Sequence, residues 1–264
     1  MKLRNTYHES VFRRRQTVRQ KQAFQYVYCM NNPVRFTDPT GMWIQYSDNT
    51  GNYRYNNGQW EQYQTSGDNI GQYTAYTPAK GSFLEGVLDG LNKLNNNVTG
   101  NELIAYFGND DNNAFIKSGD ANEADISNSA LGTITLNSNF QGSLIPTENG
   151  IQMSPFWLDI GHELAHRQDV LKNGAAQAGN TWLTAPDGKI IKQSEKYATN
   201  MENLMRADAY LPLRTHYASQ GSAGWEPSRI ITAGTRVSTY YGTTYRLTPR
   251  ILLPPLPPLP KLGF

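Results

Sequence analysis

Apolar residues recur at helical spacing in two stretches before the middle of the chain. Six apolar residues repeat every three or four positions between Phe83 and Leu94, directly after the S-x-x-E capping box Ser82–Glu85. A second box of this kind, Thr99–Glu102, precedes the apolar run 103–107. The pattern therefore predicts two helices, one from Ser82 and one from Thr99, each with a face in the core.

A third helix is predicted between Ser154-Pro155 and Gly174. Ser154 is a favoured N-cap residue, proline suits the first helical position, and glycine suits the position after the last turn. The apolar face of this helix comprises Phe156, Trp157, Ile160 and Leu164. Gly161 carries no side chain and is expected to allow close packing there. A fourth helix is predicted over 194–209.

Alternation of apolar and polar residues predicts several strands. The segments 53–55 and 59–63 flank Asn57-Gly58, a turn pair typical of a hairpin. Further strands are expected at 114–117 and 131–136, and again at 228–231 and 235–241. A chain with helices grouped after and among strands is expected to fold as an α+β protein.

Composition removes some classes of function. The chain has 264 residues, a formal net charge of +2 and 38% hydrophobic residues, so no bulk field favours nucleic acid or a membrane surface. Cys29 is the single cysteine, which excludes an intrachain disulfide and a cysteine-based zinc site. No apolar run is long enough to span a membrane. The first residues lack the apolar region of a secretory signal, so export is expected to need a carrier or a dedicated machine.

The sequence His162-Glu163-Leu164-Ala165-His166 is H-E-x-x-H, and it lies inside the third predicted helix. Residues four apart share a helix face, so both imidazoles can bind one zinc ion. Glu163 then leans toward the open coordination position, where it can act as general base on a water molecule. Two of the four histidines of the chain fall in this motif, which favours a zinc-dependent hydrolase.

A third protein ligand is expected from the helix predicted over 194–209. That helix contains no histidine, and Glu195 and Glu202 are seven residues apart on one face. The run Glu195–Thr199 resembles the E-x-x-A-D helix that supplies the glutamate ligand of many gluzincins, with Thr199 in place of the aspartate. We choose Glu195 and keep Glu202 as the rival. The other carboxylate is expected to be buried and paired with Arg206 or Arg214.

Four further residues are candidates near the metal. Asp159 and Asp169 lie three residues from His162 and His166; we take each as a solvated surface charge, with orientation of an imidazole as the alternative. Tyr217 is either a donor to the oxyanion of the tetrahedral intermediate or a packed aromatic whose hydroxyl meets a backbone group. Arg214 is a candidate to hold a substrate carbonyl or carboxylate.

The segment 26–41 contains Y-x-Y-x-x-N-N-P-x-x-x-x-D-P-x-G. It resembles the end of the core domain of Rhs/YD-repeat proteins, where the β-shell stops and a variable C-terminal toxin begins. In that family the aspartate of D-P-x-G takes part in self-cleavage, and Asp38 occupies its position. The resemblance implies a secreted or target-cell-delivered toxin whose partners are an Rhs core shell and a cognate immunity protein.

A second resemblance covers roughly 131–217. The motifs H-E-L-x-H, E-N-x-x-R and P-L-R-T-H-Y are similar to those of zinc metalloprotease effectors of the NleD kind. The likeness implies a zincin fold, Zn²⁺ as cofactor and cleavage of a target-cell protein, and it supports His162, Glu163 and His166. In zincins an edge strand before the metal helix often pairs with the substrate, and 131–136 is our candidate for it.

These observations divide the chain into four parts. Residues 1–42 are the end of an Rhs core with its linker, 43–80 a hairpin-rich connector, 81–250 a zincin-like metallopeptidase toxin domain, and 251–264 a proline-rich tail. The leading hypothesis is a zinc endopeptidase toxin with Glu163 and Tyr217 as catalytic residues and His162, His166 and Glu195 as ligands. The alternative is a non-enzymatic carbohydrate- or receptor-binding tip.

Overall fold

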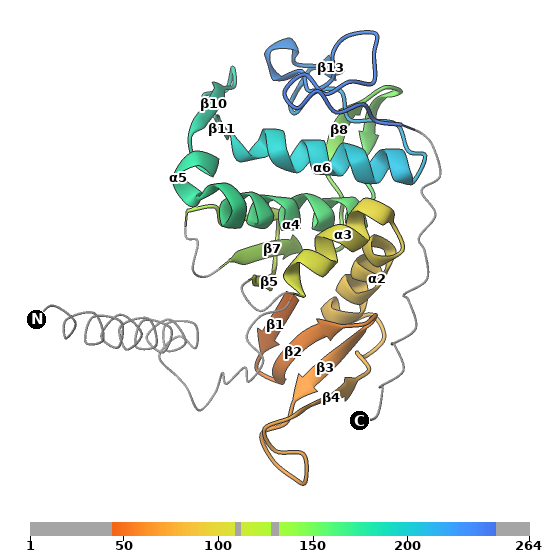
Figure 1. Ribbon diagram of the computed structural model, residues 1–264, viewed down its shortest axis with the longest axis vertical. Helices are drawn as coiled ribbons and strands as arrows, with labels where there is room; N and C mark the ends of the chain where they lie inside the picture. The colour runs from red at the N-terminus through yellow and green to blue at the C-terminus, as the bar shows by residue number, and fades with distance from the viewer. Residues whose placement is uncertain (1–43, 109–111, 128–131, 247–264) are drawn as a thin grey trace, which may run out of the picture.

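The computed structural model describes residues 44–108, 112–127 and 132–246 (Figure 1). These residues form an α+β fold with a seven-stranded mixed sheet, in the order β4-β3-β2-β1-β5-β7-β6. The sheet strands are β1 (Ile44–Asp48), β2 (Gly51–Asn56), β3 (Gln59–Tyr63), β4 (Tyr73–Tyr76), β5 (Ala114–Gly119), β6 (Glu123–Ala124) and β7 (Thr133–Asn137). The helices are α2 (Phe83–Asn95), α3 (Val98–Phe107), α4 (Phe156–Asn173), α5 (Ala175–Ala178) and α6 (Ser194–Asp208). No helix in the described ranges has both the length and the apolar character to span a membrane.

Three small hairpins lie outside this sheet. They are β8 (Leu144–Thr147) with β9 (Gly150–Met153), β10 (Thr181–Thr184) with β11 (Ile190–Lys192), and β12 (Ser219–Gln220) with β13 (Ala223–Gly224). The prediction of strands at 228–231 and 235–241 is wrong. That region has a 3-10 turn, η1 (Glu226–Ser228), and isolated bridges such as Ile231 with Ser238, because its backbone bonds to several separate segments instead of one partner strand.

The predicted hairpin at 53–63 is confirmed as β2 and β3. Asn57 and Gly58 both have positive φ angles, 48° and 88°, as a two-residue turn between twisted strands requires. Trp60 of β3 is fully buried, and its indole nitrogen donates a hydrogen bond to the carbonyl of Leu84. Since β1 pairs in parallel with β5, the hairpin-rich segment shares one sheet and one core with the strands that follow.

The two early helices differ in how well their starts were predicted. The Ser82 hydroxyl accepts a hydrogen bond from the amide of Glu85, which confirms that capping box. The box expected at Thr99 is wrong, because Asn97 caps α3 through the amide of Gly100. Thr99 instead donates its hydroxyl proton to the carboxylate of Asp208 at 2.6 Å.

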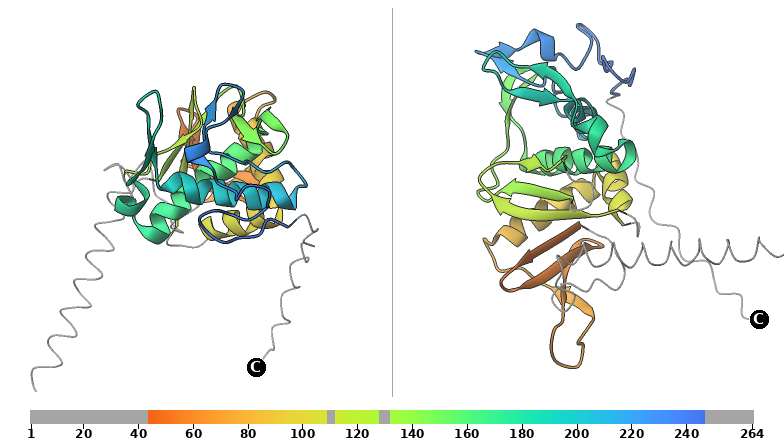
Figure 2. Two further views of the ribbon diagram at one scale, coloured as in Figure 1. Left: turned by 90° about the horizontal axis from the view of Figure 1, so that it is seen from above. Right: turned by 90° about the vertical axis from the view of Figure 1, so that its left-hand side faces the viewer.

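Helix α4 is the central element, because it lies between the sheet and α6 (Figures 1 and 2). Every residue from Leu158 to Val170 is buried, so the expectation that Asp159 and Asp169 are surface charges is wrong; each is only 6% exposed. The helix ends at Gly174 as predicted, but Pro155 takes the N-cap position. The Ser154 hydroxyl accepts a hydrogen bond from Arg206, so it does not cap the helix.

The expectation that 131–136 forms an edge strand is also wrong. Strand β7 begins at Thr133 and pairs with β5 on one side and with β6 on the other. The edge strand on this side of the sheet is therefore β6, which has two residues. Asp38, the rest of the segment that resembles the Rhs core, and the proline-rich tail lie outside the described residues.

The packing of α4 predicts a cost for a methyl group at Gly161. A Cβ atom there would lie 2.7 Å from the Met205 side chain and 2.9 Å from Leu94. Alanine favours a helix by about 1 kcal/mol over glycine, but overpacking costs about 1–3 kcal/mol. Gly161→Ala should lower the free energy of unfolding, measured in urea. In a Met205→Ala background the same change should become neutral or stabilising; a stabilised single variant would contradict the packing.

Candidate metal centre

Three side chains from α4 and α6 converge on one point. The helices run in opposite directions (Figure 1), so the middle of α4 faces the first turn of α6. The Nε2 atoms of His162 and His166 are 3.1 Å apart. A carboxylate oxygen of Glu195 lies 3.2 Å from the first and 3.1 Å from the second. The three residues offer donor atoms at the corners of a small triangle.

The size of this triangle suits a metal ion. With zinc–ligand distances of about 2.0–2.1 Å, two ligands of a tetrahedral site stand roughly 3.3 Å apart. The observed separations of 3.1–3.2 Å are close to that value. His162, His166 and Glu195 therefore form a group that can hold a metal ion, and among the described residues no other such group of His, Cys, Asp or Glu occurs.

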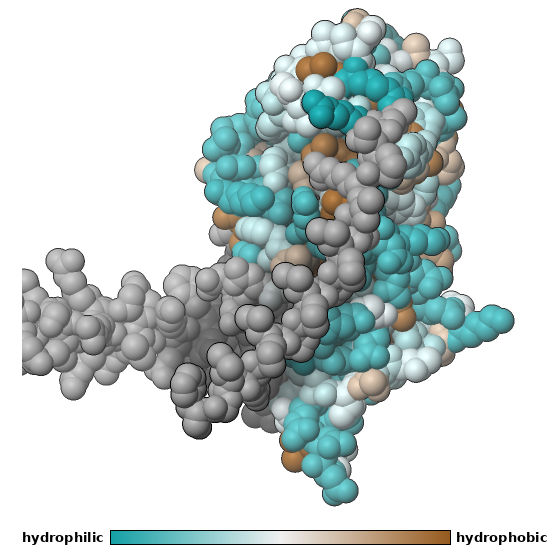
Figure 3. Space-filling view, turned by 45° about the vertical axis from the view of Figure 1, so that its right-hand side comes forward, coloured by the Kyte–Doolittle hydropathy of each residue, from teal (hydrophilic) through white to brown (hydrophobic). Residues whose placement is uncertain are grey.

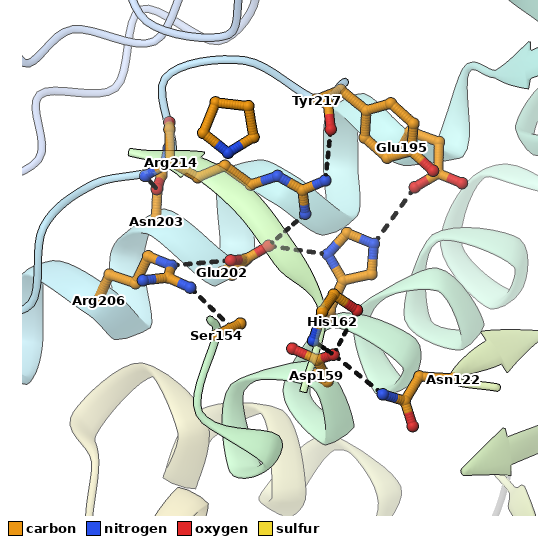
Figure 4. A network of polar contacts seen from close by, with 12 residues as sticks. Asn122, Ser154, Asp159, His162, Glu195, Glu202, Asn203, Arg206, Arg214 and Tyr217 are labelled. Carbon is orange, nitrogen blue, oxygen red and sulfur yellow. Dashed lines mark hydrogen bonds and ion pairs between the residues drawn. The ribbon is translucent and has the colours of Figure 1, made fainter. Parts of the chain in front are cut away.

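Glu202 lies on the other side of the His162 ring. Its Oε2 atom is 3.1 Å from His162 Nδ1, while its two oxygens also accept hydrogen bonds from Arg206 and Arg214 at 2.7 and 2.9 Å (Figure 4). Burial alone would raise the pKa of Glu202, but the two guanidinium groups hold it well below its usual range. The geometry thus favours Glu195 as the third metal ligand. Glu202 contacts the opposite nitrogen of the His162 ring, where it can orient that imidazole.

Arg214 connects Glu202 to the loop after α6. Its guanidinium donates hydrogen bonds to the backbone carbonyls of His216 and Tyr217, the latter at 2.7 Å. The same group lies 4.9 Å from the centre of the Tyr217 ring. Figure 4 shows Arg214 between Glu202 and Tyr217, so one side chain fixes both the outer carboxylate and the tyrosine.

The hydroxyl of Tyr217 has a side-chain partner in the site. It hydrogen-bonds the Glu195 carboxylate. Burial, and then the charge of Glu195, raises the pKa of Tyr217, so the hydroxyl keeps its proton and acts as a donor. The structure therefore places a hydrogen-bond donor beside the three converging side chains.

Glu163 is buried next to His162 on α4 and is only 6% exposed. Burial raises the pKa of Glu163 to about 7, against the opposing effect of the nearby His162 and His166. For His162, burial favours the neutral ring, but hydrogen bonds to the Glu195 and Glu202 carboxylates outweigh it and raise the pKa to about 10. The cluster of carboxylates thus favours positive charge at its centre.

The two aspartates of α4 have partners other than the imidazoles. Asp159 accepts hydrogen bonds from the amide and hydroxyl of Ser143 and from Asn122. Asp169 accepts one from Asn173. Glu202 is buried and paired with both Arg206 and Arg214, which confirms the expectation for the carboxylate that is not a ligand. Its contact with the His162 ring is what sequence reasoning missed. The available signal was its place seven residues after Glu195 on the same helix face, with Arg206 one turn further.

The site opens into a cleft of about 690 Å³. Its floor includes His162, Glu163, His166 and Glu195, and its walls come from β6, the β8–β9 hairpin, the β10–β11 hairpin and the loop after α6. Hydrolytic and binding sites commonly occupy clefts of this size. No protein-family model matches the chain, and neither the curated proteins nor the solved structures that were compared include one similar to it.

The contact between Glu202 and His162 predicts an effect on metal affinity. Loss of such an orienting carboxylate typically lowers affinity by about 10–100-fold, so Glu202→Gln should bind zinc that much more weakly in a chelator competition assay. Glu61→Gln is the matched control, because Glu61 of β3 pairs with Arg54 of β2 and does not line the cleft. Two arginines lose their partner in Glu202→Gln, so affinity must be measured on protein shown to be folded. Equal affinity in folded Glu202→Gln and wild type would contradict the assignment.

Proposed function

We propose that this protein is a zinc-dependent endopeptidase with a zincin-like active site. The observation that carries the proposal is the convergence of His162, His166 and Glu195 within hydrogen-bond distance of one another. Glu163 lies directly beside them on α4. This set of two imidazoles, one carboxylate ligand and one adjacent carboxylate is the set that metallopeptidase chemistry requires.

The donor set fits zinc. Two imidazole nitrogens and one carboxylate oxygen leave room for a fourth position, and His162 has an outer carboxylate partner. A zinc ion held by these residues would lower the pKa of water and polarise the carbonyl of a peptide bond.

The remaining steps belong to the side chains of this protein. Glu163 removes a proton from the attacking water and then delivers it to the leaving amine. A pKa of about 7 suits both directions of that transfer near neutral pH. Tyr217, held protonated, donates a hydrogen bond to the oxygen that gains negative charge. Arg214 keeps Tyr217 in place through its backbone carbonyl.

The biological setting of the proposal rests on sequence likeness. The segment 26–41 resembles the end of an Rhs core, and 131–217 contains motifs similar to those of NleD-like effectors. We infer a toxin or effector that is secreted or delivered into a target cell, where it cleaves a protein substrate. The partners implied are the Rhs core shell and a cognate immunity protein.

Glu163→Gln tests the mechanism. The amide cannot accept the proton of water, so peptide cleavage should fall by about 10²–10⁴-fold, while zinc content stays stoichiometric. The measurement is mass spectrometry of new peptide termini after incubation with a cell proteome, together with metal analysis. Glu61→Gln serves as a control with wild-type cleavage. Normal cleavage by Glu163→Gln would rule out Glu163 as the base.

A non-enzymatic, carbohydrate-binding tip remains the alternative. It would need exposed aromatic rings on the early strands. Tyr53 and Trp60 are buried in the core at 1% and 0% exposure, while Tyr63 and Tyr73 are half-buried and pack against each other. The early strands therefore present no fully exposed ring to a sugar, which favours the enzyme.

Metal removal separates the two functions. A chelator should abolish cleavage and toxicity, and one equivalent of zinc should restore both, because three of the proposed active-site groups are metal ligands. The readouts are cleaved termini, growth of a cell that expresses the protein, and binding to a glycan array. Glycan binding that survives complete zinc removal, with no cleavage at any stage, would support the binding tip instead.

A further inference from the structure

Two aliphatic side chains are exposed inside the proposed catalytic cleft. Leu144 on β8 is 66% exposed and Ile190 on β11 is 51% exposed, and both line the cleft that contains His162 and Glu163. Single exposed aliphatic groups are ordinary on protein surfaces, but exposed apolar groups that gather at one concave site commonly mark a surface that a ligand covers. Leu144 and Ile190 are thus placed where a substrate can cover them.

The two residues come from separate hairpins. Both hairpins, β8–β9 and β10–β11, extend to the same side of the α4–α6 layer (Figure 2). By contrast, hydrophobic residues on the face drawn in Figure 3 occur as separate spots among hydrophilic ones. Ile126, Pro186 and Trp225 add partly exposed apolar surface to the cleft, whereas Ile145 and Ile191 line it but are buried, at 2% and 3% exposure.

The charged groups that line the cleft are held by buried partners, belong to the proposed catalytic group, or are exposed to water. Asp159 is held by Ser143 and Asn122, and Glu202 is paired with Arg214. Glu163 and Glu195 belong to the proposed catalytic group. The other charged residues among the described lining are Glu123, Asp187 and Lys189, all of them exposed, where water screens them.

We propose that the cleft selects an extended polypeptide segment with bulky apolar side chains within two residues of the scissile bond, and that Leu144 and Ile190 form the contact. A charged substrate side chain would lose its hydration against these walls without gaining a buried partner. An apolar side chain would cover exposed aliphatic surface and gain from its removal from water. This inference rests on the proposed function, because it names the substrate class of that same site.

The experiment is cleavage of a proteome-derived peptide library by the zinc-loaded full chain. We expect the wild type to cleave beside residues such as Leu, Ile, Phe or Met. Leu144→Asp and Ile190→Asp should each lower kcat/KM for these peptides by about 10-fold, the effect of losing one good apolar contact. The variants should also accept Lys or Arg near the scissile bond, because a carboxylate then faces that position.

One control variant matches these changes. Ile70 is 64% exposed, yet it does not line the cleft. Ile70→Asp adds the same charge at similar exposure, so it should keep wild-type kcat/KM and wild-type cleavage sites within about twofold.

A binding measurement checks the contact without turnover. Zinc-loaded Glu163→Gln should bind a fluorescent hexapeptide with two central leucines about 10-fold more tightly than the same peptide with two central lysines. Adding Leu144→Asp should remove that preference.

The outcomes separate this inference from the proposed function. Wild-type cleavage without enrichment of apolar residues overturns the substrate class alone, as does an equal loss of activity in the Ile70→Asp control. No cleavage of any peptide by zinc-loaded wild type overturns the proposed function and this inference with it.

Discussion

The packing of α6 on α4 depends on one buried ion-pair network, in which the Glu202 carboxylate contacts His162, Arg206 and Arg214. Helix α4 is enclosed by the sheet on one side and by α6 on the other, so its ionisable residues cannot remain hydrated. A buried charge without a partner destabilises a protein by about 3–5 kcal/mol. The network supplies partners from α6 and from the loop after it, and it thereby fixes how α6 lies on α4.

The same network positions the groups of the candidate metal centre. Glu202 and Glu195 are two helical turns apart on α6, so anchoring one sets the height of the other above the His162 ring. Arg214 transmits this placement to the loop that bears Tyr217 through a backbone carbonyl. Arg206 extends it to the start of α4 through the Ser154 hydroxyl. The contacts that pack α6 on α4 therefore also set the geometry of the site.

Local patterns of sequence identified the parts of the site that depend on one element. The spacing of His162 and His166 on a helix follows from helical geometry alone, and so does the pairing of Asn57 with Gly58 in a hairpin turn. The choice between Glu195 and Glu202 could not be made locally. Both lie on one face of α6, and the decision depends on how that helix is shifted along α4, which is a tertiary quantity.

The errors share a physical cause. Ser154 and Thr99 have the residue types of caps, but each bonds to a side chain far along the sequence, Arg206 and Asp208 respectively. These charged partners form stronger hydrogen bonds than a backbone amide does. An isolated helix would expose the aspartates of α4, so the sequence alone predicts surface charges there, whereas the sheet and α6 bury them.

The electrostatics and the geometry of the centre both favour the binding of a cation. Carboxylates from Glu195 and Glu202 meet the two nitrogens of the His162 ring, and they raise its pKa to about 10 although burial opposes protonation. The direction of that shift indicates that the surrounding oxygens favour positive charge between them. A divalent cation in the triangle of donor atoms would satisfy the same potential, and its binding would require a neutral imidazole. A site that served only to stabilise the fold would need no such convergence, because apolar residues of similar volume often stabilise as well as buried ion pairs do.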